Sequence, residues 1–211
     1  MAATPPPTTH SSTARESGAR GRPGYSREQI IRIAVAEFNA HGYEATSMGK
    51  LADRLGISKS AIYHHVSSKE EILVEATDHA LSELTAALDD AATADGDSRE
   101  QLRAAIFGAT TVLCANPDEV TLLIRLRGNT EVEQEIMERR RSITRDFISH
   151  VKAAQQDELL RTDIDAALAG RLTLGTINSI TEWYRPTGLL QPEELATAVT
   201  SMVMEGLANR P

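Results

Sequence analysis

Residues 51–66, LADRLGISKSAIYHHV, decide the fold that the sequence predicts. Apolar residues in and just before this stretch recur at the i, i+3, i+4, i+7 spacing of a helix face, at Met48, Leu51, Ala52 and Leu55. Gly56 then ends this short helix, and Ser58 is a favoured N-cap residue for a second one that runs to about His65. Two short helices joined by a glycine-containing turn are the helix-turn-helix pattern.

Both flanks of this segment carry further helix signals. Upstream, Ser26 with Gln29 has the form of a capping box, and apolar residues at helical spacing follow until His41-Gly42 ends the pattern. Thr46 or Ser47 is the expected N-cap of the next helix. Downstream, Ser68 with Glu71 forms another capping box and opens a long helix.

The rest of the chain also predicts helices and no strand. We expect a capping box of Ser98 with Gln101, and turns at Asn116-Pro117 and Gly128-Asn129. The expected helices cover about 69–91, 99–116, 118–127, 130–156, 164–184 and 192–208. The predicted fold is all-α, with about nine helices, and its N-terminal domain is a three-helix helix-turn-helix unit over residues 25–70.

Charge is distributed unevenly along the chain. The net charge of the whole chain is −8, yet residues 1–68 carry eight Lys/Arg against five Asp/Glu, whereas residues 69–211 carry fourteen against twenty-five. The N-terminal third is therefore net basic, as a domain that meets phosphates requires, and the acidic remainder would be repelled by DNA. Residues 1–24 are rich in Pro, Ser, Thr, Gly and Arg, which predicts a disordered basic arm.

Several classes of protein are disfavoured by composition. The sequence has no apolar run long enough to span a membrane and no signal-peptide core, so we expect a cytoplasmic protein without a membrane partner. Its single cysteine, Cys114, lies in an apolar stretch and is interpreted as a core residue, the alternative being a reactive thiol. We expect no metal and no cofactor, since ligand spacings and Gly-rich phosphate loops are missing from the sequence.

One face of the second short helix has the chemistry of a DNA reader. Lys59, Ser60, Tyr63 and His64 share that face, while Ala61 and Ile62 turn inward. Such cations, hydroxyls and aromatic tips can contact phosphates or base edges. A solvated polar face on a small helical bundle has the same pattern, and the face alone does not decide between the two.

A family resemblance favours the DNA reader. Residues 42–47 (GYEATS), 51–66 and 68–73 (SKEEIL) together resemble the DNA-binding head of the tetracycline-repressor (TetR) family. The resemblance implies that phosphates are contacted by Thr46, Ser47, Tyr63, His65 and Lys69. It further implies that Lys59, Ser60 and His64 face bases, and that the remainder, 71–211, is a ligand-binding and dimerisation domain.

The N-terminal arm offers a second possible DNA contact. Arg20-Gly21-Arg22-Pro23 matches the core of the AT-hook, in which Arg20 and Arg22 would enter an A·T-rich minor groove. A solvated basic tail that attracts DNA without sequence preference is the other interpretation.

The last two predicted helices are candidates for a homodimer interface. The resemblance implies that these helices pair with their symmetry mates. The last one presents an apolar stripe of Leu195, Ala198, Val199, Met202, Val203 and Gly206, and the helix before it is rich in small residues. A core within one chain is the alternative.

The resemblance places a small-molecule effector among the middle helices. The candidate ligand-binding residues are Phe107, Leu123, Arg125, Arg127, Phe147, Ile177, Trp183 and Tyr184, although each apolar member is equally suited to a core. Trp183-Tyr184-Arg185-Pro186 is similar to a helix ending in relatives that respond to acyl-CoA thioesters. Hydrophobic drugs and small aromatic acids remain alternatives.

The predicted function is a ligand-responsive transcriptional regulator that binds double-stranded DNA, a repressor released from a palindromic operator by its effector. An architectural DNA-binding protein without an effector is the first alternative. An enzyme centred on Cys114 or on His64-His65 is disfavoured, because neither has a recognisable catalytic or metal-binding signature around it.

Overall fold

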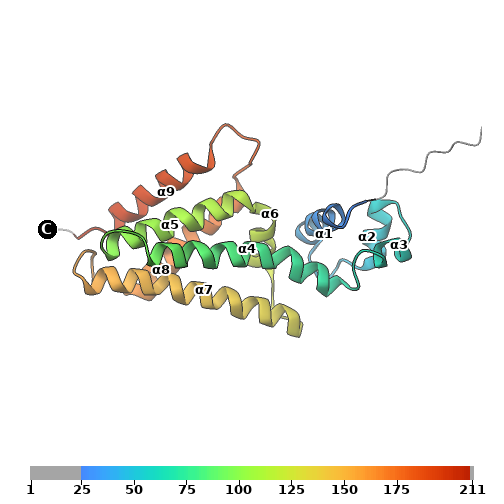
Figure 1. Cartoon of the computed structure of the whole chain (residues 1–211), viewed down its shortest axis with the longest axis horizontal. Coiled ribbons are helices and arrows are strands. Elements are labelled where there is room, and N and C mark those ends of the chain that lie inside the picture. Colours follow the sequence, from blue (N-terminus) through green and yellow to red (C-terminus); the bar gives the residue numbers. More distant parts are fainter. Residues whose placement is uncertain (1–24, 210–211) are drawn as a thin grey trace, which may run out of the picture.

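The computed structural model describes residues 25–209, and these residues form a helical head joined to a larger helical body (Figure 1). The predicted arm, with Arg20 and Arg22, lies outside the described residues. Within them the structure has nine α-helices, one short 3₁₀ segment and a single isolated β-bridge between Leu160 and Ala208. The prediction of an all-α fold is confirmed.

The head is built from three short helices and the start of a long one. They are α1 (Arg27–His41), α2 (Met48–Leu55), α3 (Lys59–Tyr63) and α4 (Lys69–Ala92). The predicted capping box at Ser26 is present, and the side chains of Ser47, Ser58 and Ser68 cap α2, α3 and α4. Gly56 ends α2 in the left-handed conformation, with φ 67° and ψ 32°, which allows the sharp turn into α3.

The body contains the remaining helices. They are α5 (Ser98–Ala115), α6 (Pro117–Arg125), α7 (Glu131–Gln156), α8 (Ala166–Ser179), the 3₁₀ segment η1 (Ile180–Glu182) and α9 (Pro192–Leu207). The expected cap at Ser98 is wrong: the carboxylate of Asp97 accepts the first backbone N–H groups, and the Ser98 hydroxyl donates instead to Asp157 at 2.6 Å. The helix expected over 164–184 is shorter, because its last turn tightens into η1.

Helix α4 connects the two parts. Figure 1 shows it running from the head into the body, where it packs between α5 and α7. Its buried residues continue along its whole length, from Ile72 and Leu73 in the head to Leu81 and Leu88 in the body. Helix α9 covers α5, and α8 covers α7. None of the described helices is long and apolar enough to cross a membrane.

A close contact fixes α8 against α7. A Cβ added at Gly170 would lie 2.7 Å from Cγ1 of Ile148. Because any side chain would overlap Ile148, only glycine permits this approach of the two helices. The cavity described below lies further along the same pair of helices.

Candidate functional site

The surface of α3 presents the residues expected to read DNA. Lys59, Ser60, Tyr63 and His64 are exposed, with Tyr63 at 50% of its full accessibility, whereas Ile62 is completely buried. The burial of Ile62 anchors α3 on the head core and directs the polar residues outward. The predicted inner and outer faces are confirmed for Ile62 and for the four exposed residues, whereas Ala61 is only half-buried.

Lys59 and Ser47 converge at the N-terminus of α2. The Lys59 side chain lies over Gly49, where an added Cβ would be 2.9 Å from Lys59 Cε and 3.6 Å from Ser47 Oγ. Ser47 Oγ accepts the N–H of Lys50 and keeps its own hydrogen for another partner. A cation, a hydroxyl and a helix N-terminus together form a place for a phosphate oxygen. Lys50, which sequence reasoning missed, lies beside them and donates to the carbonyl of Ala45 at 2.7 Å.

Thr46 is not on this surface. Its exposed fraction is 1%, its hydroxyl donates to Gly42 O at 2.9 Å, and its N–H donates to Tyr43 O. The expectation that its side chain contacts phosphate is therefore wrong, because both donors are already used inside the protein. Thr46 instead closes the turn that presents Ser47.

Lys69 is held beside Tyr43. Its ammonium lies 4.1 Å from the centre of the Tyr43 ring and donates to the Tyr43 carbonyl at 3.0 Å. Burial raises the pKa of the Tyr43 phenol, with nearby carboxylates adding to the effect, so this ring is neutral in the physiological range. An ammonium has three donors, so Lys69 can also meet a phosphate at the start of α4.

Arg27 connects α1, to which it belongs, with α3 and α4. Its guanidinium pairs with Glu71 at 2.6 Å and with Glu75, both on α4, and donates to the carbonyl of His65 at the end of α3. The His65 side chain is half-buried. The hydrogen bond that Glu71 accepts from Arg27, together with the one from the Ser67 N–H, lowers the pKa of Glu71 to about 2. The orientation of α3 thus depends on α1 and α4.

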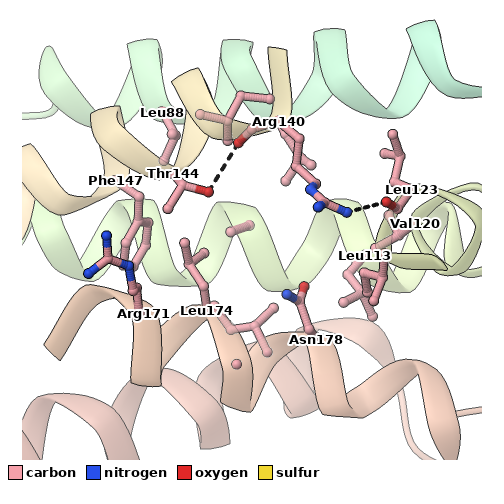
Figure 2. A pocket seen from close by; sticks show the side chains of 16 residues that line it. Leu88, Leu113, Val120, Leu123, Arg140, Thr144, Phe147, Arg171, Leu174 and Asn178 are labelled. Carbon is pink, nitrogen blue, oxygen red and sulfur yellow. Dashed lines mark hydrogen bonds between the residues drawn. The ribbon is translucent and has the colours of Figure 1, made fainter. Parts of the chain in front are cut away.

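The body contains an apolar cavity of about 340 Å³ among α4 to α8 (Figure 2). Its walls include three of the predicted ligand residues, Leu123, Phe147 and Ile177. Other aliphatic walls come from the same helices, namely Leu84, Leu88, Leu113, Val120, Ile124, Ile143 and Leu174.

Two arginines and two neutral polar side chains interrupt the apolar lining. Arg140 and Thr144 come from α7, and Arg171 and Asn178 come from α8 (Figure 2). Arg140 is half-buried and donates to the carbonyl of Leu123, whereas Arg171 and Asn178 are exposed and lie with Gly175 where the cavity opens along α8. Burial lowers the pKa of the Arg140 guanidinium.

The other predicted ligand residues lie away from this cavity. Trp183 is 53% exposed and Tyr184 is buried, and neither lines it. Phe107 borders a separate groove between α4, α5 and α9. Arg125 and Arg127 line a cleft between head and body. The expectation that these five residues surround one effector is wrong for this cavity, because none of the five belongs to its lining.

The sequence gives only partial information about the two arginines of the cavity, Arg140 and Arg171. Arg140 belongs to the run Arg139-Arg140-Arg141, three adjacent cations in one of the predicted middle helices. In the structure Arg139 pairs with Asp78, and Arg141 pairs with Glu138. Only Arg140 of the three faces the cavity, and no signal in the sequence singles out Arg171.

Helix α6 links the cavity wall to the head. Asn39, in the last turn of α1, donates from its side chain to Asp118 O at 2.8 Å. Its own carbonyl accepts from Arg125 at 2.7 Å. Asp118 lies in the first turn of α6 and Arg125 is its last residue. Both ends of α6 are therefore bound to one residue of α1.

The candidate dimer surface is narrower than the sequence indicated. Leu168, Leu172 and Met202 are more than half exposed, and a shallow groove between α8 and α9 lies among Leu172, Val203 and their neighbours. In contrast, Leu195 and Val199 are buried within the chain, so those two members of the predicted stripe belong to the body's own core.

Cys114 is also buried, as expected for a core residue, and burial raises the pKa of its thiol.

Family models match both parts of the chain. Residues 30–76 match the model described as "Bacterial regulatory proteins, tetR family", and residues 95–207 match "Tetracyclin repressor-like, C-terminal domain". The second match alone covers more than half of the chain. Together they include the helix-turn-helix surface and the cavity lining except for Leu84 and Leu88.

Similar whole proteins include regulators of known structure. The chain is 30% identical over 216 residues to the HTH-type transcriptional repressor KstR2 of Rhodococcus jostii (strain RHA1), with 98% of each protein covered. The structure of SCO3833 from Streptomyces coelicolor A3 is 40% identical, with a TM-score of 0.80, over 88% of this chain and 94% of that one. AibR in complex with isovaleryl coenzyme A and operator DNA has the same fold, at 23% identity and a TM-score of 0.67, over 83% of this chain and 96% of that one.

Proposed function

Because the chain belongs to the TetR family of transcriptional regulators, we propose that it is a repressor whose affinity for its operator falls when an acyl-CoA thioester enters the cavity of the body. The observation that carries the choice of effector is an apolar cavity with an arginine at its exposed mouth. Residues 25–70 would form the DNA-binding domain and residues 71–209 the effector and dimer domain, with α4 shared between them.

Cavity size favours an effector that is only partly enclosed. About 340 Å³ suits an acyl group, whereas coenzyme A with its nucleotide is larger than the cavity and would have to remain outside. Arg171 and Asn178 lie at the exposed end of the cavity, where a guanidinium can bind phosphate through two parallel hydrogen bonds. The isovaleryl-CoA complex of AibR, a protein of the same fold, supports the same class of effector.

The operator would be contacted by the exposed face of the head. We assign phosphate contacts to Ser47, Tyr63, His65 and Lys69, and base contacts to Lys59, Ser60 and His64. The support for the base contacts is the exposure of α3, and the support for the phosphate contacts is the exposed Ser47 hydroxyl at the N-terminus of α2. Two heads would reach successive major grooves if a dimer formed through α8 and α9, which would give half-sites about 34–36 Å apart or a multiple of that spacing.

The effector is tested with octanoyl-CoA, octanoate and coenzyme A, each titrated into the purified protein and into its complex with operator DNA. Isothermal calorimetry reports binding, and fluorescence anisotropy reports DNA release. We expect octanoyl-CoA to bind tightest and to release DNA. Arg171→Met should weaken octanoyl-CoA by about tenfold and leave octanoate unchanged, because only the thioester carries the phosphates that Arg171 would meet.

The opposite result has a clear meaning. If octanoate and octanoyl-CoA bind equally and Arg171→Met affects neither, the effector is not a thioester. Arg145→Met, which alters an exposed arginine of α7 paired with Glu138, is the control for loss of positive charge.

The dimer is tested by charge at its exposed surface. Leu172→Asp and Met202→Asp should each convert a dimer to a monomer in sedimentation without lowering helix content, because both side chains are exposed in the single chain. Leu189→Asp, at a fully exposed loop position, is the matched control. A dimer that survives both changes would contradict this interface.

A further inference from the structure

Arg140 differs from every neighbouring arginine of α7. Arg139, Arg141 and Arg145 are exposed and pair with carboxylates, whereas Arg140 is half-buried against the apolar cavity. Among residues 25–209 its guanidinium has one hydrogen-bond partner, the carbonyl of Leu123, and no acidic partner. Removing a charge from water without pairing it is costly, so an unpaired guanidinium in this place favours an acceptor that enters from the cavity.

Within the described part of the chain, the Leu123 carbonyl accepts its hydrogen bond from Arg140. It lies in the last turn of α6, where backbone carbonyls lack helical partners. The Arg127 N–H, which would reach it in a longer helix, is turned instead to the buried carboxylate of Glu133. Arg140 therefore caps the C-terminus of α6, an end where the helix dipole also favours a cation.

The far side of α6 is attached to the head. Asp118 and Arg125 bind the side chain and the carbonyl of Asn39, so a movement of α6 is transmitted directly to the end of α1. Arg27, at the start of α1, in turn binds α4 and the carbonyl of His65 after α3. An unbroken series of hydrogen bonds and helices thus joins the cavity wall to the DNA-reading surface.

We propose that Arg140 selects effectors that bring an oxygen acceptor, anionic or carbonyl, to its guanidinium in the cavity, and that it releases α6 when it turns to that oxygen. This inference rests on the proposed function for the presence of an effector. A carboxylate competes well with a backbone carbonyl, because it can accept two parallel hydrogen bonds from the guanidinium and also pairs its charge. The freed turn of α6 then displaces α1 and lowers the affinity of the head for DNA.

The proposal predicts that filling the cavity is not sufficient for release. A ligand without an oxygen acceptor would leave the Arg140 to Leu123 contact intact, so it would bind without changing DNA affinity. A ligand changes the populations of the two arrangements of α6 only if it binds one arrangement more tightly than the other. Octane and octanoate, which share one chain, separate binding from release.

The first experiment needs no effector. Hydrogen exchange is measured for the amides at the end of α6 and the end of α1 in the wild type, Arg140→Met and the control Arg139→Met. We expect exchange at both helix ends to be at least about tenfold faster in Arg140→Met, as the loss of a charge-assisted hydrogen bond implies. Arg139→Met should match the wild type. Equal protection in all three proteins would overturn the capping role.

The second experiment measures coupling, defined as the ratio of the Kd for operator DNA with saturating octanoyl-CoA to the Kd without it. The expected ratio is about 5–150 in the wild type and close to one in Arg140→Met, where the effector has nothing to displace. Arg140→Lys keeps one cationic donor and should restore part of the ratio. If Arg140→Met fails to fold, the ratio can still be measured in Arg140→Lys, because this substitution keeps the positive charge.

The outcomes separate the two proposals. If octanoyl-CoA does not bind the wild type, the proposed effector is wrong, and the exchange experiment alone decides the role of Arg140. If octanoyl-CoA binds and releases DNA from Arg140→Met and from Arg140→Lys by the wild-type ratio, the role of Arg140 is refuted while the effector assignment stands. Release of DNA by octane at saturation would also refute the proposed role of Arg140.

Discussion

The head and the body differ in how far apart in sequence their functional residues lie. The DNA-reading surface is made by residues 47–69, where each helix is short and each cap is visible in the sequence. The walls of the cavity come from five helices, between Leu84 and Asn178. A local motif therefore specifies the first site, whereas only the packing of distant helices specifies the second.

The head and the body also differ in how their arginines are paired. In the head, Arg27, Glu71 and Glu75 form a paired network on the surface. In the body, Arg140 faces an apolar space with a backbone carbonyl as its partner. Paired charges fix an arrangement, and a charge that lacks an acid partner is available to a ligand. The head is thus expected to respond to substitution through DNA affinity, and the body through stability and coupling.

The largest expected effect lies in the body. Phe147 is completely buried at the cavity wall, so Phe147→Ala enlarges an existing space and removes packing from α7. We expect the free energy of unfolding to fall by about 3–5 kcal/mol in urea denaturation. Phe107→Ala, at a side chain that is 37% exposed, is the control and should cost far less. Equal losses would mean that the cavity wall is no better packed than the surface.

The second prediction concerns the head alone. Lys59→Ala and Tyr63→Ala should each weaken operator binding by about tenfold or more, because base and phosphate contacts contribute about 1–3 kcal/mol each. Tyr63→Ala should act on all sequences alike, and Lys59→Ala should alter the preference among operators. The affinity for octanoyl-CoA without DNA should be unchanged, as calorimetry would show. Wild-type DNA affinity in both variants would contradict the assignment of α3.

The structure shows why the head was predicted almost residue by residue. Capping serines, Gly56 and the apolar spacing act within a few residues of one another, so the helices and the outer face of α3 follow from the sequence. Thr46 was the exception, because a hydroxyl's choice between Gly42 O and a phosphate is decided by the turn geometry. Neighbouring Ser and Thr residues look alike in sequence and point to different environments.

The cavity could be predicted only as a region. Leu123, Phe147 and Ile177 were identified as apolar residues of the middle helices, but the sequence has no means to tell a cavity wall from the core. Trp183 was a candidate because residues 183–186 are similar to a helix ending in relatives that respond to acyl-CoA thioesters, yet its side chain follows η1 and is exposed. Which arginine of 139–141 faces inward depends on the rotation of α7, which is set by its contacts with α4 and α8.

A third prediction uses the same substitution in both regions. Gly56 has a φ of +67°, which disfavours any side chain, whereas Gly175 lies within α8 and an added Cβ meets nothing within 4 Å. Gly56→Ala should therefore lower the free energy of unfolding by about 1–2 kcal/mol, and Gly175→Ala should raise it by about 0.5–1 kcal/mol. Thermal unfolding of both variants provides the comparison. A loss at Gly175 would indicate that a second chain approaches α8 closely in the dimer.

The smallest expected effect is the pH dependence of the head network. The pKa of Glu71 is lowered from 4.5 to about 2 by its hydrogen bonds with Arg27 and with the Ser67 N–H, so the folded protein holds this proton less tightly than the unfolded chain. Between these two pH values the unfolded state binds more protons, and stability from Glu71 is therefore complete above pH 4.5 and is lost as pH falls toward 2. Glu71→Gln does not titrate. The difference in unfolding free energy between wild type and Glu71→Gln should be constant above pH 4.5 and should shrink below it, and added salt should reduce it because the pair is partly exposed. A difference that stays constant from pH 6 down to pH 3 would show that Arg27 holds α1 to α4 without depending on the charge of Glu71.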